Sequence, residues 1–199
     1  MTEGILTLLR AGTQEAHTKL EQYVDMPARA GDLPRYENLV EAFLGWYEPM
    51  ERSLAEAGDW SPTGYLPAER AKSGWLVSDL RALGRAPEEI AALPRCAALP
   101  KIDSLAAGFG CAYVMEGATL GGRAITALLA GRVPEEGRSF FRSYGEATRE
   151  RWLQFLASVD RFAETQGGKD QIVEAAAESF RSFESWLRQC DERSKAAKS

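Results

Sequence analysis

Hydrophobic side chains recur along most of the chain with the spacing of an α-helix. Between residues 5 and 24 the apolar positions are Ile5, Leu9, Ala16, Leu20 and Val24. Steps of four or seven residues place these side chains on one helical face. The same spacing predicts further helices at about 33–57, 71–83, 87–93, 144–166 and 170–190, and one that starts at Asp103 or Ser104 and continues past Val114. No run alternates with the period of a β-strand. The pattern therefore predicts a single all-α domain over residues 1–190 and a flexible tail over residues 191–199.

The composition restricts the class of protein and leaves the all-α prediction unchanged. The chain has 199 residues, 45% of them hydrophobic and 27% charged, and its net charge is −5. These values are ordinary for a globular protein, and the charge argues against general binding of nucleic acid. The N-terminus does not have the form of a signal peptide, and no apolar run is long enough to enter a bilayer as a helix. Three well-separated cysteines without a CxxC pair favour a reducing compartment, so we expect a cytoplasmic protein.

The stretch TQEAHTKLE at residues 13–21 contains the single histidine of the chain, His17. Glu21 follows one helical turn later, where a carboxylate can orient the imidazole, as carboxylates often do for a metal-bound histidine. A single histidine at a helix edge is more often a partly exposed polar residue than a metal ligand. One histidine excludes a zinc site with several histidines and a di-iron bundle with paired Glu-x-x-His motifs. A metal bound by His17 would need its other ligands elsewhere, and haem meets this need because the porphyrin supplies four nitrogens.

A second unusual stretch, YVMEGATLGG at residues 113–122, contains three glycines in a predicted helix. Each glycine costs about 1 kcal/mol of helix stability relative to alanine. Gly117 and Gly121 share one face because they are four residues apart, and Gly122 adjoins it. The bare face has two structural interpretations, close helix packing or a break of the helix. It also has a functional interpretation, a flat ligand pressed against the backbone. Together with an orientable histidine on another helix, it would form a sandwich for a planar cofactor.

These two stretches resemble the proximal and distal helices of the haem oxygenase family, in particular the bacterial members found alongside bacteriophytochromes. The proximal motif is LRAGTQEAHTKLE at residues 9–21, and the distal motif is YVMEGATLGG. KSGWLVSDLRALG at residues 72–84 and FESWL at 183–187 are also similar to bacterial members. The resemblance implies a single helical domain with haem between a proximal and a glycine-rich distal helix.

Carried over by position, the resemblance implies a role for individual residues. His17 would be the axial iron ligand and Glu21 its orienting neighbour, and Arg10 would pair with a haem propionate. Gln14 replaces another basic residue found in some members. On the distal helix, Tyr113 would contact the haem. Backbone carbonyls, or the hydroxyl of Tyr113 or Thr119, could hold ordered water there. The catalytic wall of the distal helix would be formed by Gly117, Gly121 and Gly122.

The activity that the resemblance implies is cleavage of haem, both cofactor and substrate, at a meso carbon to biliverdin, iron and carbon monoxide. The reaction consumes O₂ and electrons from an external donor, such as a ferredoxin or a reductase, because the chain has no GxGxxG fingerprint for a nucleotide cofactor. A bacteriophytochrome is a possible acceptor of the biliverdin. Ala118 departs from the aspartate that animal members use to organise proton delivery. This keeps open the alternative of a haem-binding or carrier protein without turnover, whereas the His17–Glu21 pair argues against a related helical enzyme that binds no haem.

Overall fold

Ten α-helices and five short 3₁₀ segments form the regular structure of residues 4–196, which is the part of the chain that the computed structural model describes. The helices are α1 (Ile5–Val24), α2 (Met26–Ala30), α3 (Leu33–Glu56), α4 (Ser73–Ala82), α5 (Pro87–Ala92), α6 (Leu105–Gly117), α7 (Gly122–Leu129), α8 (Ser139–Arg142), α9 (Thr148–Thr165) and α10 (Lys169–Ala196). The 3₁₀ segments are η1 (Ser61–Thr63), η2 (Pro67–Arg70), η3 (Ala118–Gly121), η4 (Glu135–Arg138) and η5 (Gly145–Ala147). Residues 4–196 contain no strand, so the all-α prediction is confirmed. None of these helices is both long enough and apolar enough to cross a membrane.

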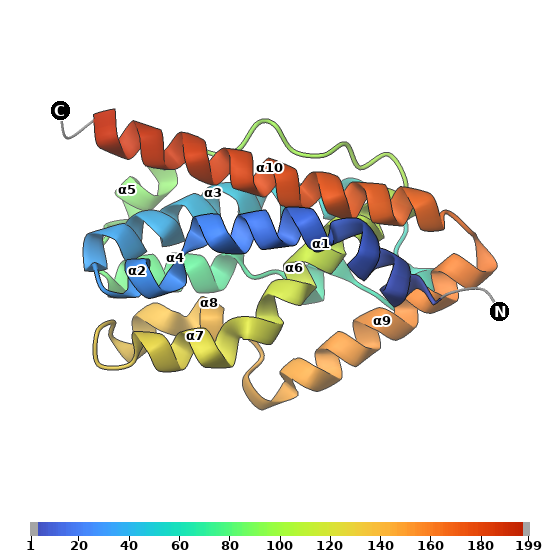
Figure 1. Ribbon diagram of the computed structural model, residues 1–199, viewed down its shortest axis with the longest axis horizontal. Helices are drawn as coiled ribbons and strands as arrows, with labels where there is room; N and C mark the ends of the chain where they lie inside the picture. The colour runs from blue at the N-terminus through green and yellow to red at the C-terminus, as the bar shows by residue number, and fades with distance from the viewer. Residues whose placement is uncertain (1–3, 197–199) are drawn as a thin grey trace.

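Helix α10 organises the fold, because it lies along both α1 and α6 (Figure 1). Small side chains let the axes of α6 and α10 approach closely. At Gly110 a β-carbon would overlap the carbonyl oxygen of Ile172 and would lie 2.8 Å from the side chain of Ala175. Gly110 therefore serves the packing of α6 against α10.

Helix α1 has the bounds that its apolar spacing predicts. Its buried face includes Ile5, Leu9 and Leu20, which pack into the main core. The helix ends at Asp25, whose backbone adopts the left-handed conformation with φ 42°. The carboxylate of the same residue accepts a hydrogen bond from the amide of Ala28 and so caps α2. Residues 25–27 thereby turn the chain sharply at one end of α1.

The glycine-rich helix is interrupted, and a break was one of the three outcomes that its sequence left open. Helix α6 ends at Gly117, four residues follow as the 3₁₀ segment η3, and α7 begins at Gly122. At this break the hydroxyl of Thr119 donates to the carbonyl of Glu116 at 2.7 Å. Glycine's low helix propensity and this side-chain competitor for a backbone carbonyl account for the break.

Helix α10 includes residues 191–196 of the tail that the sequence predicts to be flexible, since it ends at Ala196. Asp191 accepts hydrogen bonds at 2.7 Å from Nη2 of Arg29 and from the hydroxyl of Tyr23. The guanidinium of Arg29 is buried, and its hydrogen bonds lower the pKa of Asp191 although burial opposes the shift. These long-range contacts hold the end of α10 against α1 and α2. Residues 197–199 of the expected tail lie outside the described part.

The cysteines form no disulfide. Cys96 and Cys111 are buried and Cys190 is partly buried. Burial raises the pKa of Cys111 to about 11, so its thiol stays protonated at neutral pH. It is a residue of the hydrophobic core.

A buried group of charges lies behind the end of α6. Glu116 and Lys72 are each 1% exposed. The ammonium of Lys72 donates to Oε1 of Glu116 at 2.7 Å and to the carbonyl of Arg70 at 2.9 Å. Nη1 of Arg70 lies 3.3 Å from Oε2 of Glu116. Two cations on the segment before α4 thus fix the last turn of α6, next to the glycine break.

Replacing Lys72 with methionine tests this anchor. The change removes the ammonium that pairs with a buried carboxylate and donates to a buried carbonyl, so the free energy of unfolding should fall by about 3 kcal/mol. Urea denaturation measures the loss. Lys101→Met is the matched control, since Lys101 pairs with Asp103 at the surface and is 84% exposed. Its effect should stay below about 0.5 kcal/mol, and equal losses in the two variants would contradict the anchoring role.

Candidate functional site

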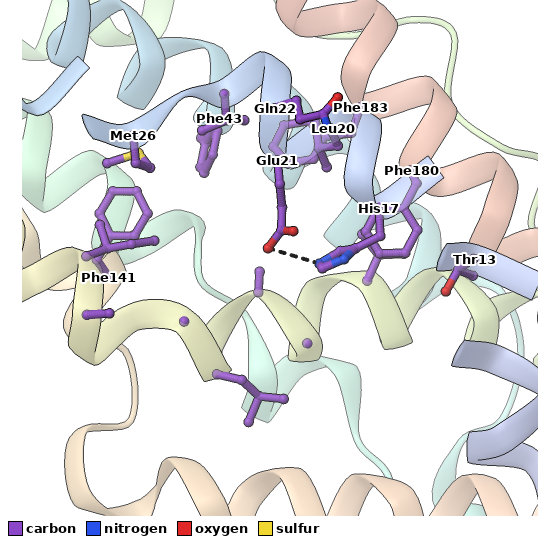
Figure 2. Close-up of a pocket in the computed structure, with 18 of the residues that line it drawn as sticks. Thr13, His17, Leu20, Glu21, Gln22, Met26, Phe43, Phe141, Phe180 and Phe183 are labelled. Atoms are coloured by element: carbon purple, nitrogen blue, oxygen red, sulfur yellow. Dashed lines mark ion pairs between the residues drawn. The ribbon is translucent and has the colours of Figure 1, made fainter. Parts of the chain in front are cut away.

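A cavity of about 780 Å³ opens between α1 and the broken helix formed by α6, η3 and α7. Side chains of α3, α8 and α10 close its inner side. Figure 2 shows His17 and Glu21 projecting from α1 toward the glycine-rich segment on the opposite side. The two stretches that the sequence singled out therefore face each other across one pocket, whose size is in the range of small-molecule sites.

His17 stands at the edge of the apolar face of α1. Its side chain is 45% exposed, and its ring packs edge-on against Phe180 of α10 with 5.2 Å between centroids. One turn earlier, Thr13 is buried, with its hydroxyl bonded to the carbonyl of Leu9 at 2.7 Å. A ring supported on one edge and open on the other has a nitrogen available to a ligand in the cavity.

Glu21 is the neighbour of His17 that the spacing predicts. Its Oε1 atom lies 3.5 Å from Nε2 of the imidazole, and its carboxylate is 68% exposed within the open side of the cavity. An imidazole coordinates a metal through one nitrogen and donates a hydrogen bond through the other. Coordination by Nε2 would therefore require the ring to turn Nδ1 toward the carboxylate, or the carboxylate to withdraw from Nε2.

The inner wall of the cavity is aromatic. Its buried members on α3, α8 and α10 are Phe43, Tyr47, Phe140, Phe141, Phe180 and Phe183. The rings pack on one another, with 4.9 Å between the centroids of Phe43 and Phe183. The spacing of the aromatic residues of α10 in the sequence indicates helix packing and does not reveal that Phe180 and Phe183 also line the pocket. A stripe that packs on its neighbours along one side can face a cavity along another.

Polar and charged side chains gather at the open side. Arg10, Gln14, Gln22 and Asp25 all line the cavity and are exposed. Arg10 is the only lysine or arginine among the residues that line the pocket. The site therefore offers an apolar interior and a polar mouth with a single permanent positive charge.

Two of the three predicted wall glycines face the cavity. Gly117 and Gly121 both line it. A β-carbon built at Gly117 would have no neighbouring atom within 4 Å, and one built at Gly121 would have Cδ1 of Ile125 as its nearest neighbour, at 3.9 Å. Gly122 does not line it, and a β-carbon there would overlap the carbonyl oxygen of Phe141. The assignment of Gly122 to the catalytic wall is thus corrected, because this glycine lets α7 pack against α8.

The other candidate residues of the distal segment also differ in whether they line the cavity. Tyr113 lines the cavity, is half-buried and packs against Trp152 with 5.8 Å between centroids. Ala118 lines the cavity and is exposed, whereas Thr119 is buried and turns its hydroxyl to the backbone. Thr119, proposed beside Tyr113 as a holder of ordered water, therefore lies outside the pocket wall.

Comparisons with known proteins relate most of the chain to one family. The family model described as Heme oxygenase matches residues 3–189. A protein named "Heme oxygenase" from Xanthomonas campestris pv. campestris (strain 8004) is 29% identical over 168 residues. The alignment covers 83% of this chain and 92% of that relative. The similarity therefore spans both sides of the cavity.

Alanine substitutions distinguish the packing glycine from the wall glycines. Gly122→Ala should lower the free energy of unfolding by about 1–3 kcal/mol, because the new methyl group meets the backbone of α8. Gly117→Ala should leave it unchanged or raise it by up to about 1 kcal/mol, since the site is helical and open. Thermal and urea unfolding measure both. Equal destabilisation by the two changes would show that the wall is as tightly packed as the α7–α8 contact.

Proposed function

The chain belongs to the heme oxygenase family, and on that premise we propose that it binds haem in this cavity and cleaves it at a meso carbon to biliverdin, iron and carbon monoxide. The observation that carries the proposal is the opposition of His17 to the bare backbone of Gly117 and Gly121 across one pocket. A flat ligand that takes one axial protein ligand needs both features.

The distribution of polarity also fits haem. The macrocycle is apolar apart from its nitrogens, and the aromatic wall of α3, α8 and α10 matches it. The two propionates are anionic and belong at the polar mouth. Arg10 lines the mouth and would pair with one of them, because a guanidinium binds a carboxylate with two parallel hydrogen bonds.

Each residue then has a distinct task. Haem supplies the iron redox chemistry and is itself the substrate that is opened. A nitrogen of His17 would be the protein's ligand to the iron, and Glu21 would orient the ring and accept a hydrogen bond from its other nitrogen. On the opposite side, Gly117 and Gly121 would admit a flat ligand close to the backbone. Their side-chain-free surface would restrict the position of O₂ and so contribute to the choice of the carbon that is attacked.

Ala118 is the reason for a second candidate function, which is binding of haem without its degradation. A methyl group at this exposed position of the wall cannot hold a water molecule by a hydrogen bond. Turnover therefore requires another source of protons. It also requires electrons from an external donor protein, of the ferredoxin or reductase type that the family resemblance implies, with a bacteriophytochrome as one possible acceptor of biliverdin.

A single assay separates the two functions. The purified protein is titrated with hemin until a Soret band develops, and ascorbate and air are then added in the presence of catalase. Loss of the Soret band with growth of the red absorbance of biliverdin supports the oxygenase. A stable Soret band supports the carrier, and no band at all contradicts both.

His17→Ala should abolish the axial ligation. We expect hemin affinity to fall at least about 10- to 100-fold, in line with the cost of disturbing metal ligation, and turnover to stop. Added imidazole should restore the ferric spectrum by filling the space that the ring leaves. Lys19→Ala is the control on the same helix, since Lys19 is exposed, pairs with Glu15 and does not line the cavity. An unchanged ferric spectrum in His17→Ala would remove this residue from the site.

Gly121→Leu should fill the space that the wall leaves open. We expect the variant to fold, and either to bind hemin more weakly, by about 1–2 kcal/mol for a displaced apolar contact, or to give a different biliverdin isomer. Absorbance titration and chromatography of the product measure these effects. Gly74→Leu adds the same side chain at an exposed helical glycine outside the pocket. Identical affinity, rate and isomer in the two variants would contradict a role for the bare wall.

A further inference from the structure

Helix α8 contributes two rings to the inner wall of the cavity, although it is only four residues long. Phe140 and Phe141 both line the cavity and are buried. A helix of a single turn has no stability of its own, because its nucleation cost is not repaid by further backbone hydrogen bonds. The position of these two rings therefore depends on the contacts that other elements make with α8.

A single buried carboxylate holds the start of α8. Asp79 of α4 is 0% exposed, and its Oδ1 atom accepts a hydrogen bond from the amide of Ser139 at 2.6 Å. Its Oδ2 atom accepts one from the amide of Phe140 at 2.9 Å. The first amides of a helix have no partner within the helix, so the carboxylate satisfies two of them. One side chain of α4 thus binds the backbone of a residue whose ring faces the cavity.

Asp79 is ionised at neutral pH although it is buried. Burial raises the pKa of Asp79 to about 6, and the hydrogen bonds from Phe140 and Ser139 and the charge of Arg142 oppose the rise. Hydrogen bonds to an ionised acceptor are shorter and stronger than those between neutral groups. The contact between α4 and α8 is therefore a charge-assisted one inside the core.

Other contacts hold the segments on either side of these two amides. The carbonyl of Gly137, two residues before α8, accepts a hydrogen bond from the hydroxyl of Tyr36 at 2.8 Å. Arg142, the last residue of α8, pairs with Glu135 at the surface, where both side chains are exposed. Neither contact reaches the first two amides of the helix, which are left to Asp79.

The wall that α8 forms lies at the end of the cavity away from Arg10. Figure 2 shows Phe141 and Thr13 on opposite sides of His17. Arg10 precedes Thr13 by about one turn of α1 and lines the mouth, where the proposed function places a propionate. Phe141 would then meet the edge of the macrocycle that has no propionates. The ligand would thus be confined between a charge at one end and an aromatic wall at the other.

We propose that Asp79 is a positioning residue, which holds Phe140 and Phe141 in place through the backbone of α8 and thereby sets how haem is turned within its own plane. The inference rests on the proposed function. The four meso carbons of a porphyrin lie a quarter turn apart, so rotation of the ring changes which of them is next to the open face of Gly117 and Gly121. A wall that retreats permits such rotation, so Asp79 contributes to the choice of the biliverdin isomer.

Asp79→Asn is the direct test, because the amide has the same size but accepts from only one of the two backbone amides and turns an NH₂ group toward the other. We expect hemin affinity to fall about 3- to 10-fold, as for the loss of one hydrogen bond. The share of minor biliverdin isomers should rise by roughly twofold or more, because a displaced wall misplaces the ligand. Absorbance titration and chromatography of the product measure these effects. The haem methyl resonances in the proton NMR spectrum of the ferric complex should also shift or double, and they report the in-plane orientation without turnover.

Ser104→Ala is the matched control. Ser104 caps α6, where its hydroxyl oxygen accepts a hydrogen bond from the amide of Ala107 at 3.1 Å, and it does not line the cavity. Both substitutions remove a side-chain acceptor from the first turn of a helix, so both should lower the unfolding midpoint. Only Asp79→Asn should change the isomer ratio and the methyl resonances. If it leaves both as they are in Ser104→Ala and in the wild type, the positioning role is overturned.

Phe141→Leu tests the wall itself and leaves the carboxylate in place. The smaller side chain should change the isomer ratio and the methyl resonances in the same direction as Asp79→Asn. Should Asp79→Asn give no folded protein, an unaltered ratio and spectrum in Phe141→Leu overturn the inference, and altered ones support it. A wild-type protein that binds no hemin overturns the proposed function, and the inference with it. If the wild type binds hemin without turnover, only the proposed cleavage fails, and the methyl resonances still decide the role of Asp79.

Discussion

The distal wall of the cavity is backbone without side chains, so it cannot fix its own position and must be held from behind. The structure does this at three places. Gly110 lets α6 press against α10, Gly122 lets α7 press against α8, and Glu116 is anchored by the buried cations of Lys72 and Arg70. Between these points the break in the helix leaves Gly117 and Gly121 open to the pocket. The width of the cavity thus depends on contacts made on the side of the wall that the ligand never reaches.

The proximal side of the cavity is built differently, because α1 contributes side chains to it. Its buried face fixes the helix against α10, and only the edge of that face reaches the pocket. A histidine at this edge is held by Phe180 and remains accessible, which a position in the middle of the buried face would prevent. The polar residues on the exposed side of the same helix then form the mouth. One amphipathic pattern therefore determines both how α1 packs and which residues meet a ligand.

Local sequence predicted much of this, and the failures have a common physical cause. Spacing alone gave the bounds of α1, and the pairing of His17 with Glu21 follows from their place on one helix. Asp191, which the sequence assigns to the tail, accepts a hydrogen bond from Arg29, a residue 162 positions away. Consecutive helical positions point about 100° apart, so Gly121 and Gly122 face different neighbours, and only the placement of α8 decides which of them packs against backbone. The missing information is always the identity of the facing element.

Tyr47 shows the same dependence in a form that bears on chemistry. In the sequence it is one aromatic residue among several on the buried face of α3, and nothing in its spacing distinguishes it from Tyr36. In the fold, Tyr36 meets a carbonyl, whereas Tyr47 lies between a cavity and a buried carboxylate. A charged cluster in a core is costly to desolvate and is weak evidence for stability. Here the cluster sits where α3, the segment before α4 and the glycine break meet, so its charges anchor the distal wall. Glu116 therefore cannot be exchanged without releasing the wall from behind.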